Sequence, residues 1–288
     1  MKFQQYREED YEAVCAFLID LNRNDRDHIN WNWARFEWMF EHPEFDKNSI
    51  SSIGLWFSHD KVVGAAIYDM YFGEAFCAAL PGFEELYPEI LEYAYRELKD
   101  STGLGIAICD GNGKEIEAAK AQGFAPAEQT ETVMKLELDR MIPGKLSEGF
   151  RFAELDPAKE AYAFQWLLWQ GFDHGDDRAE FEREDPIIPQ IRRRFDPALS
   201  IAAVDQAGKK LAYCCLWYQQ GTDYAYVEPV CTVPAARGKG LAKAVLFEAL
   251  NRAKKLGAER AYVISDMDFY TKLGFKIDRR YSFYWKSY

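Results

Sequence analysis

The stretch Tyr226-Val-Glu-Pro-Val-Cys-Thr-Val-Pro-Ala-Ala-Arg-Gly-Lys-Gly-Leu-Ala-Lys-Ala-Val-Leu-Phe-Glu-Ala-Leu250 decides how this chain folds. Its first part is rich in β-branched and aromatic residues, which is typical of a β-strand. Pro234 has no N–H to donate to a sheet, so it ends the strand. Apolar residues then recur at helical spacing from Leu241 onward. The stretch therefore predicts a strand, a tight glycine loop and a long helix.

A glycine loop at the start of a helix is a place where anions bind. The first N–H groups of a helix lack partners within it, and the helix dipole adds positive potential there. Gly238 and Gly240 let the backbone approach a phosphate, while Arg237 and Lys239 add positive charge. The loop thus suits a phosphate or pyrophosphate. An ordinary strand-to-helix turn with solvated basic residues is the alternative that local physics leaves open.

The loop lacks the patterns of two common phosphate sites, Gly-x-Gly-x-x-Gly and Gly-x-x-x-x-Gly-Lys-Ser/Thr. It does contain Arg237-x-x-Gly240-x-Ala242, which resembles the Arg/Gln-x-x-Gly-x-Gly/Ala signature of the GNAT superfamily of N-acetyltransferases. Further on, Asp268-Phe-Tyr-Thr-Lys-Leu-Gly-Phe275 is similar to the Leu-Tyr-x-Lys-Leu-Gly-Phe element of the same family. The two motifs occur in the order that the family shows.

The composition indicates a soluble globular protein of two domains. The chain has 288 residues, of which 48% are hydrophobic and 28% are charged. Its formal net charge of −12 argues against nucleic acid as a partner, because duplex binding needs a basic face. The negative charge favours a cationic or amine-bearing substrate through steering, and simple solubility is the alternative explanation.

The six cysteines form no Cys-x-x-Cys pair and have no accompanying histidine cluster, so we expect neither a metal site nor a disulfide framework. The N-terminal residues contain no apolar signal region, and no apolar run reaches the length of a membrane span. We therefore expect a cytoplasmic protein that has no membrane partner.

The order of predicted elements repeats along the chain, which indicates an internal duplication. Cys77-Ala-Ala-Leu-Pro-Gly matches Cys231-Thr-Val-Pro-Ala-Ala in position, and Gly123-Phe124 matches Gly274-Phe275. A polar stretch with glycine and proline at 139–149 is the expected linker. The duplication predicts a degenerate N-terminal GNAT-like domain at 1–139 and a C-terminal GNAT domain at 149–288.

The fold class implied by the resemblance is α+β, with mixed α/β layers. Each domain is expected to be an acyl-CoA N-acyltransferase (GNAT) fold, a mixed and mostly antiparallel sheet flanked by helices. The periodicity predicts helices that include an aromatic one at 29–40 and another at 181–194, which ends in three arginines. These arginines could reach a coenzyme phosphate or form a solvated helix face.

Only the second copy has the loop chemistry. Where the first copy would need it, Glu84 and Glu85 stand and would repel phosphates. In the family the loop amides bind the pyrophosphate of acetyl-CoA, and the strand before the loop holds the pantetheine arm. The resemblance therefore implies one acetyl-CoA site, with these cofactor-binding residues: Cys231, Val233, Arg237, Gly238, Lys239, Gly240, Leu241 and Ala242.

Three side chains are candidates for the chemistry. Glu228 could take the proton of the attacking amine, or it could be an edge-strand carboxylate that binds substrate charge or nothing. Tyr270 matches the family tyrosine that acts as general acid, and an aromatic core residue is the alternative. Cys231 could act as a nucleophile, but direct transfer is simpler because no histidine lies in the last hundred residues.

The resulting prediction is an acetyl-CoA-dependent N-acetyltransferase, an acyltransferase transferring groups other than aminoacyl groups, that works by direct attack and without metal. The alternatives are a non-catalytic acyl-CoA-binding or sensor module and an O-acyltransferase. The acceptor is expected to be an amine-bearing small molecule rather than a protein. The aromatic helix and the acidic stretch at 173–177 are candidates for lining the acceptor cleft. Both a monomer and a homodimer are compatible with the duplication.

Overall fold

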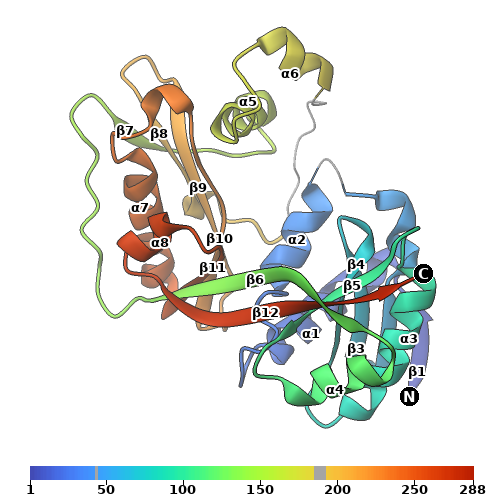
Figure 1. Ribbon diagram of the computed structural model, residues 1–288. Helices are drawn as coiled ribbons and strands as arrows, with labels where there is room; N and C mark the ends of the chain where they lie inside the picture. Colours follow the sequence, from blue (N-terminus) through green and yellow to red (C-terminus); the bar gives the residue numbers. More distant parts are fainter. Residues whose placement is uncertain (43–44, 185–192) are drawn as a thin grey trace. The chain divides into compact units, whose positions relative to one another are not determined.

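The computed structural model describes residues 1–42, 45–184 and 193–288, and these form two compact units (Figure 1). Unit 1 consists of Met1–Met134, Ile264–Asp266 and Ile277–Tyr288. Unit 2 consists of Lys135–Val263 and Met267–Lys276. Each unit is therefore built from segments that are not contiguous in the sequence.

The sheet of unit 1 is mixed and mostly antiparallel. Its strands follow the order β1 (Lys2–Gln5), β2 (Gly54–Ser58), β3 (Lys61–Asp69), β4 (Tyr71–Ala79), β5 (Gly103–Cys109) and β12 (Lys276–Ser287). The pair β4–β5 is parallel, and the other pairs are antiparallel. The helices of this unit are α1 (Tyr11–Leu21), α2 (Trp33–Glu41), α3 (Tyr87–Glu97) and α4 (Gly113–Ala121). Strand β6 (Ala125–Glu137) leads from unit 1 into unit 2.

The last strand of the chain lies in the N-terminal unit. β12 pairs antiparallel with β5 in a regular register that runs from Tyr281 opposite Cys109 to Ser287 opposite Gly103. The boundaries expected from the sequence, 1–139 and 149–288, place this strand in the second domain instead. A pattern of apolar and polar residues identifies a strand, but it does not say which strand is its neighbour.

The aromatic helix begins later than its periodicity suggests. The side chain of Asn32 accepts hydrogen bonds from the N–H groups of Ala34 and Arg35, which makes Asn32 the N-cap of α2. Trp33 and Phe36 of this helix are fully buried, and the Phe36 ring stacks on Tyr11 of α1. The apolar side of α2 is thus part of the core of unit 1.

Unit 2 has the same kind of architecture. Its strands follow the order β11 (Arg260–Ile264), β10 (Tyr224–Thr232), β9 (Lys210–Tyr218), β8 (Ser200–Val204) and β7 (Arg151–Glu154). Only β10–β11 is parallel among these pairs. The helices are α5 (Ala161–Gly171), α6 (Arg178–Glu184), α7 (Leu241–Leu256) and α8 (Asp268–Lys272). Helices α5 and α7 cover opposite faces of the sheet (Figure 1). The predicted class, mixed sheets flanked by helices, is confirmed in both units.

Two sequence expectations concern connecting segments. The linker at 139–149 has no regular secondary structure, and it is tied to α7 because the Asn251 side chain bonds both the N–H and the carbonyl of Ile142. The helix expected at 181–194 is described only as far as Glu184, as part of α6. Arg192, one of its three arginines, lies outside the described residues.

A substitution at Gly105 tests the pairing of β5 with β12. A Cβ atom at Gly105 would lie 2.5 Å from ring atoms of Trp285 on β12. Gly105→Ala should therefore lower the free energy of unfolding by about 1–3 kcal/mol through overpacking. Gly113→Ala is the control, because a Cβ at this first residue of α4 meets no atom within 4 Å. Urea unfolding of both variants checks this, and equal midpoints would contradict the β5–β12 pairing.

Candidate functional site

The site in unit 2 begins where two parallel strands separate. β10 pairs with β11 at only three positions, from Tyr224 opposite Arg260 to Tyr226 opposite Tyr262. Beyond them β10 stays paired with β9, after a register shift between Val227 and Val230. A bulge of this kind bends a strand away from its neighbour. Residues 228–232 therefore have one backbone edge that no described strand pairs with.

The register shows which backbone groups face this open edge. The Val233 N–H donates to the carbonyl of Leu211, which follows the first residue of β9, at 2.9 Å. Since successive residues of a strand direct their backbone groups to opposite edges, Cys231 also faces β9, while Val230 and Thr232 face away from it. The Val233 N–H thus already has a partner on β9, and the expected contacts of Cys231 and Val233 with a pantetheine arm stay predictions.

The loop after β10 holds its glycines in the left-handed region. Gly238 has φ +77° and Gly240 has φ +75°, a conformation that glycine adopts without the steric cost other residues pay. A Cβ atom at either position would meet nothing within 4 Å, so the space beside the loop is open. Glycine is therefore required here by the backbone conformation.

A run of backbone N–H groups is unpaired at the start of α7. Gly240 is the N-cap of this helix and supplies no side chain to cap it. Within the described part of the chain, no hydrogen bond uses the N–H of any residue from 238 to 243, which includes Lys239, Leu241 and Ala242. The first turn also carries no acidic side chain. These groups and the helix dipole form a site for an anion.

Arg237 anchors this loop to neighbouring segments of unit 2. Its guanidinium donates to the carbonyl of Thr232 at 3.1 Å, to the carbonyl of Gly171 at 3.0 Å and to the carboxylate of Asp173 at 2.9 Å. Its own N–H donates to the Pro234 carbonyl. The side chain therefore ties the loop to the end of β10 and to α5. Asp173, the first residue of the acidic stretch, is the partner of this arginine.

Glu228 and Tyr270 lie in the same part of unit 2. Tyr270 on α8 is 7% exposed, and no described residue hydrogen-bonds its hydroxyl. Burial raises the pKa of Tyr270, and the charges of Cys214 and Glu228 raise this pKa further. The phenol therefore stays protonated at neutral pH. Glu228 is half-buried on β10, where its backbone carbonyl accepts a hydrogen bond from the Trp217 indole at 2.8 Å.

The thiol of Cys231 is poorly placed for nucleophilic attack. Cys231 is 5% exposed, and its Sγ lies 3.9 Å from the carbonyl of Leu167 on α5. Burial raises the pKa of Cys231 to about 12, although the charge of Arg237 acts in the opposite direction. Since the thiolate is the nucleophilic form, direct transfer is the chemistry that this environment favours.

In the corresponding loop of unit 1, four backbone N–H groups are hydrogen-bonded within the described residues. The Gly82 N–H donates to the carboxylate of Glu84 at 2.9 Å. The N–H groups of Phe83, Leu86 and Tyr87 donate to backbone carbonyls of the same turn, and Pro88 has none. The carboxylate of Glu84 thus takes the place of an external anion at the Gly82 N–H, while the N–H groups of Glu84 and Glu85 have no partner among the described residues.

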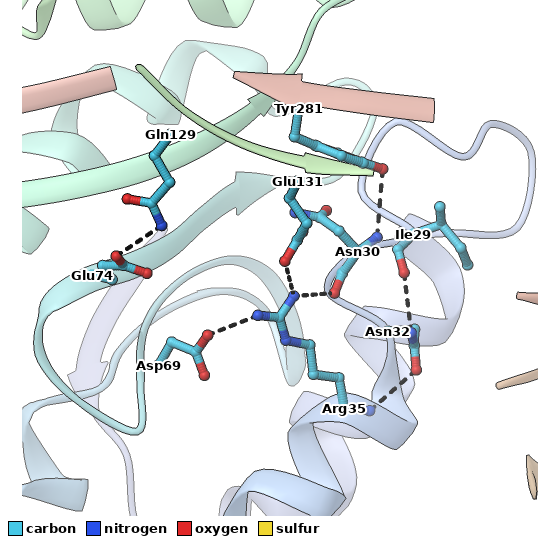
Figure 2. Close-up of polar contacts among 9 residues, drawn as sticks. All are labelled: Ile29, Asn30, Asn32, Arg35, Asp69, Glu74, Gln129, Glu131 and Tyr281. Atoms are coloured by element: carbon cyan, nitrogen blue, oxygen red, sulfur yellow. Dashed lines mark hydrogen bonds and ion pairs between the residues drawn. The ribbon is translucent and has the colours of Figure 1, made fainter. Parts of the chain in front are cut away.

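A second correspondence between the units was not identified from the sequence. Glu74 precedes Cys77 by the same spacing that separates Glu228 from Cys231. Figure 2 shows that Glu74 accepts a hydrogen bond from Gln129 at 3.1 Å. Burial raises the pKa of Glu74, and Gln129 opposes this shift. The repeated Glu-x-x-Cys spacing in the sequence could have revealed that Glu74 corresponds to Glu228.

Arg35 of α2 joins the polar cluster around Glu74 (Figure 2). Its guanidinium pairs with Asp69 at 2.8 Å and with Glu131 at 3.0 Å, and it donates to the carbonyl of Asn30. The cavity at this place has a volume of only about 10 Å³, which is room for roughly one water molecule. The position equivalent to Glu228 is therefore packed in unit 1 rather than open to a substrate.

No helix among the described residues is long and apolar enough to cross a membrane. Among the same residues, no group of three or more His, Cys, Asp or Glu side chains is arranged so that it could hold a metal ion.

Comparison with known proteins agrees with the motifs. Residues 161–275 match the family model described as Acetyltransferase (GNAT) family. No curated protein matches the chain in sequence. Among solved structures, a GCN5-related N-acetyltransferase from Sphaerobacter thermophilus is 16% identical with a TM-score of 0.60, over 99% of this chain and 95% of that one.

Two further solved structures are also similar over nearly the whole chain. A tandem GNAT protein from the clavulanic acid biosynthesis pathway is 16% identical with a TM-score of 0.61, over 99% of this chain and 98% of that one. The N-myristoyltransferase of Saccharomyces cerevisiae is 13% identical with a TM-score of 0.55, over 99% and 78%. At such identities the likeness shows the fold, and it confirms the tandem GNAT architecture.

The raised pKa of Cys231 predicts that its thiol is unreactive in the native protein. All six cysteines are buried and free. Titration with a chromogenic disulfide at pH 8 should therefore release almost no colour from folded protein and the full six equivalents after unfolding. A fast-reacting thiol that disappears in Cys231→Ser would restore the covalent mechanism as an option.

Proposed function

We propose that this chain, which belongs to the GNAT family of acetyltransferases through its domain at 161–275, transfers an acetyl group from acetyl-CoA to an amine. The single observation that carries the proposal is the run of unpaired backbone N–H groups at 238–243, next to the open edge of β10. A pyrophosphate satisfies such groups, and an extended pantetheine arm can pair with an open strand edge.

The cofactor residues follow from this geometry. The N–H groups from Gly238 to Ala242 would hold the pyrophosphate, with charge added by the exposed Lys239. Arg237 would act by holding the loop in place. Val230 and Thr232 would pair with the pantetheine arm. Acetyl is the proposed acyl group, although the yeast N-myristoyltransferase was solved with bound myristoyl-CoA.

The transfer would proceed in one direct step. The Glu228 carboxylate would take a proton from the acceptor ammonium, which frees the nitrogen lone pair. The nitrogen would then bond to the thioester carbon as the carbon–sulfur bond breaks. The Tyr270 hydroxyl, protonated because burial raises the pKa of Tyr270, would donate its proton to the departing coenzyme thiolate. The attacking nitrogen would lose its second proton to water as the amide forms, and a proton from water would restore the phenol. The products are an amide and free coenzyme A.

Unit 1 would be a degenerate copy of the domain. Four of its loop N–H groups are bonded internally, and its counterpart of Glu228 is hydrogen-bonded to Gln129. The acceptor would be a small molecule that carries a primary amine. The net charge of −12 supports a cationic acceptor, because a negative protein raises the local concentration of cations.

Calorimetric titration with acetyl-CoA tests the cofactor site. The native protein should bind about one equivalent, and Gly240→Glu should abolish binding, since glutamate adds bulk, strain and negative charge at the anion site. Gly82→Glu is the matched control, because Gly82 also has positive φ and open space around it in the corresponding loop. Binding of two equivalents, or loss of binding in the Gly82 variant, would contradict a single site in unit 2.

Tyr270→Phe and Glu228→Gln test the chemistry. Each should lower kcat by roughly 10²–10⁴-fold with little change in the Kd of acetyl-CoA, because general acid and base groups act on the reaction rather than on cofactor binding. The readout is coenzyme A release over a panel of small amines at saturating acetyl-CoA. If both variants keep the native rate, neither side chain is needed for transfer, and a site that only binds acetyl-CoA, as in a sensor, becomes the better explanation.

The pKa of Tyr270 also predicts a pH dependence. A raised pKa keeps the general acid protonated through neutral and mildly alkaline pH, so its alkaline loss of rate should begin above the ordinary tyrosine value of about 10. A loss of rate that sets in below this value and persists in Tyr270→Phe would assign the titration to another group.

A further inference from the structure

Unit 1 contains a cavity of about 300 Å³ that neither the proposed reaction nor the polar cluster around Arg35 uses. It lies between the segment that precedes α2, the end of β4 and the first turns of α3 and α4. Pro81, on its wall, directly follows Leu80, which matches Pro234 in the repeat, so the cavity adjoins the counterpart of the loop that in unit 2 offers free N–H groups. A volume of this size suits a small organic molecule.

The side chains that line the cavity carry a net negative charge, which would repel a phosphate. Its lining includes the carboxylates of Asp25, Asp27, Glu84 and Glu115, against Lys114 and His28. Even with the histidine protonated, the lining carries a net charge of −2, from four carboxylates and two cations. An anion is repelled here and a cation is attracted.

Two of these carboxylates already have cationic partners. The Glu115 carboxylate lies 2.9 Å from Nε2 of His28, and Asp27 lies 3.5 Å from the Arg279 guanidinium. Asp25 and Glu84 accept only backbone N–H bonds, and neither has an ion-pair partner among the described residues. These two carboxylates are therefore available to an external cation.

The buried wall of the cavity adds a polar group that lacks a partner. Tyr87 is 4% exposed and lines the cavity, and no hydrogen bond of its hydroxyl is present in the described residues. The apolar remainder of the wall includes Leu21, Ala79 and Ala118. A hydroxyl that lines the cavity without a protein partner is open to a ligand that can hydrogen-bond to it.

We propose that this cavity binds a small organic cation, an ammonium or guanidinium group on a short carbon chain, and that unit 1 is in this respect a cation-binding domain. The carboxylates of Asp25 and Glu84 would pair with the cationic group, and the Tyr87 hydroxyl would accept or donate one hydrogen bond. The carbon chain would lie against the apolar wall. A divalent metal ion fits less well, because the described residues offer no group of three metal-ligating side chains.

Calorimetric titration of the full chain with 1,4-diaminobutane tests the proposal. The native protein should bind about one equivalent, and Glu84→Lys should weaken binding by about tenfold through reversal of a charge at the site. Glu85→Lys is the matched control, since Glu85 is the next residue of the same short helix and does not line the cavity. Its effect should stay below about twofold, because both variants change the net charge equally.

Two further variants separate this site from the others. Tyr87→Phe, which removes only the hydroxyl, should weaken binding by a few-fold, as expected for loss of one hydrogen bond of about 1 kcal/mol. Gly240→Glu should leave diamine binding unchanged, so failure of the acetyl-CoA site in unit 2 does not bear on this result. Thermal unfolding of each variant shows whether it is folded.

Several outcomes would overturn the proposal. Absence of diamine binding to the folded native protein would do so directly. Equal weakening by Glu84→Lys and Glu85→Lys would show a diffuse effect of net charge. Competition by acetyl-CoA that persists in Gly240→Glu would make the cavity a second coenzyme site, and tighter binding of magnesium chloride with the same sensitivity to Glu84→Lys would make it a metal site.

Discussion

The separation of β10 from β11 after Tyr226 is the constraint on which the site in unit 2 depends. A strand inside a sheet normally has partners on both edges, because an unpaired backbone group away from water costs free energy. Here one edge of residues 228–232 is left without a partner strand, and the loop that follows adds further unpaired N–H groups. An extended ligand with an anionic end can satisfy both features at once.

The two parallel strands of unit 1 also separate, but the loop that follows them carries acidic side chains. β4 pairs with β5 only at Glu74 and Ala75, so these strands separate as well. In this unit, however, Glu84 binds the loop N–H of Gly82, and carboxylates line the cavity beyond. Two parallel strands therefore separate in both units, and the charges around the loops that follow them differ. A retained fold does not imply a retained ligand.

The sequence predicts best what depends on neighbouring residues. The strand, the glycine loop and the helix after it follow from local conformational preference, and Gly238 and Gly240 occupy the left-handed region. The pairing of β12 with β5 could not be predicted, because it joins residues about 170 positions apart and many strands could offer the same apolar face. The second domain expected at 149–288 therefore included the last strand, β12, which lies in unit 1.

The role of a charged side chain is equally hard to read from the sequence. Arg237 and Lys239 stand two positions apart in one motif and look alike as phosphate ligands. The structure separates them although both are exposed, because Arg237 donates to two carbonyls and to Asp173, whereas the Lys239 ammonium lies 6.0 Å from the centre of the Phe150 ring. Two of these partners come from the end of α5 and the turn after it, more than sixty residues earlier in the chain. A motif thus records which residue types a loop needs without recording what each of them touches.

The two glutamates of the Glu-x-x-Cys repeat show why position alone does not define a catalytic group. Glu74 and Glu228 occupy equivalent places before the strand separates. Glu74 is bonded to Gln129 next to the Arg35 cluster, and burial raises its pKa, so it is held as part of the packing of unit 1. Glu228 instead lies close enough to Tyr270 to raise the pKa of the phenol. The Glu228 carboxylate and the protonated Tyr270 phenol therefore influence each other electrostatically, which is what the proposed acid–base roles require.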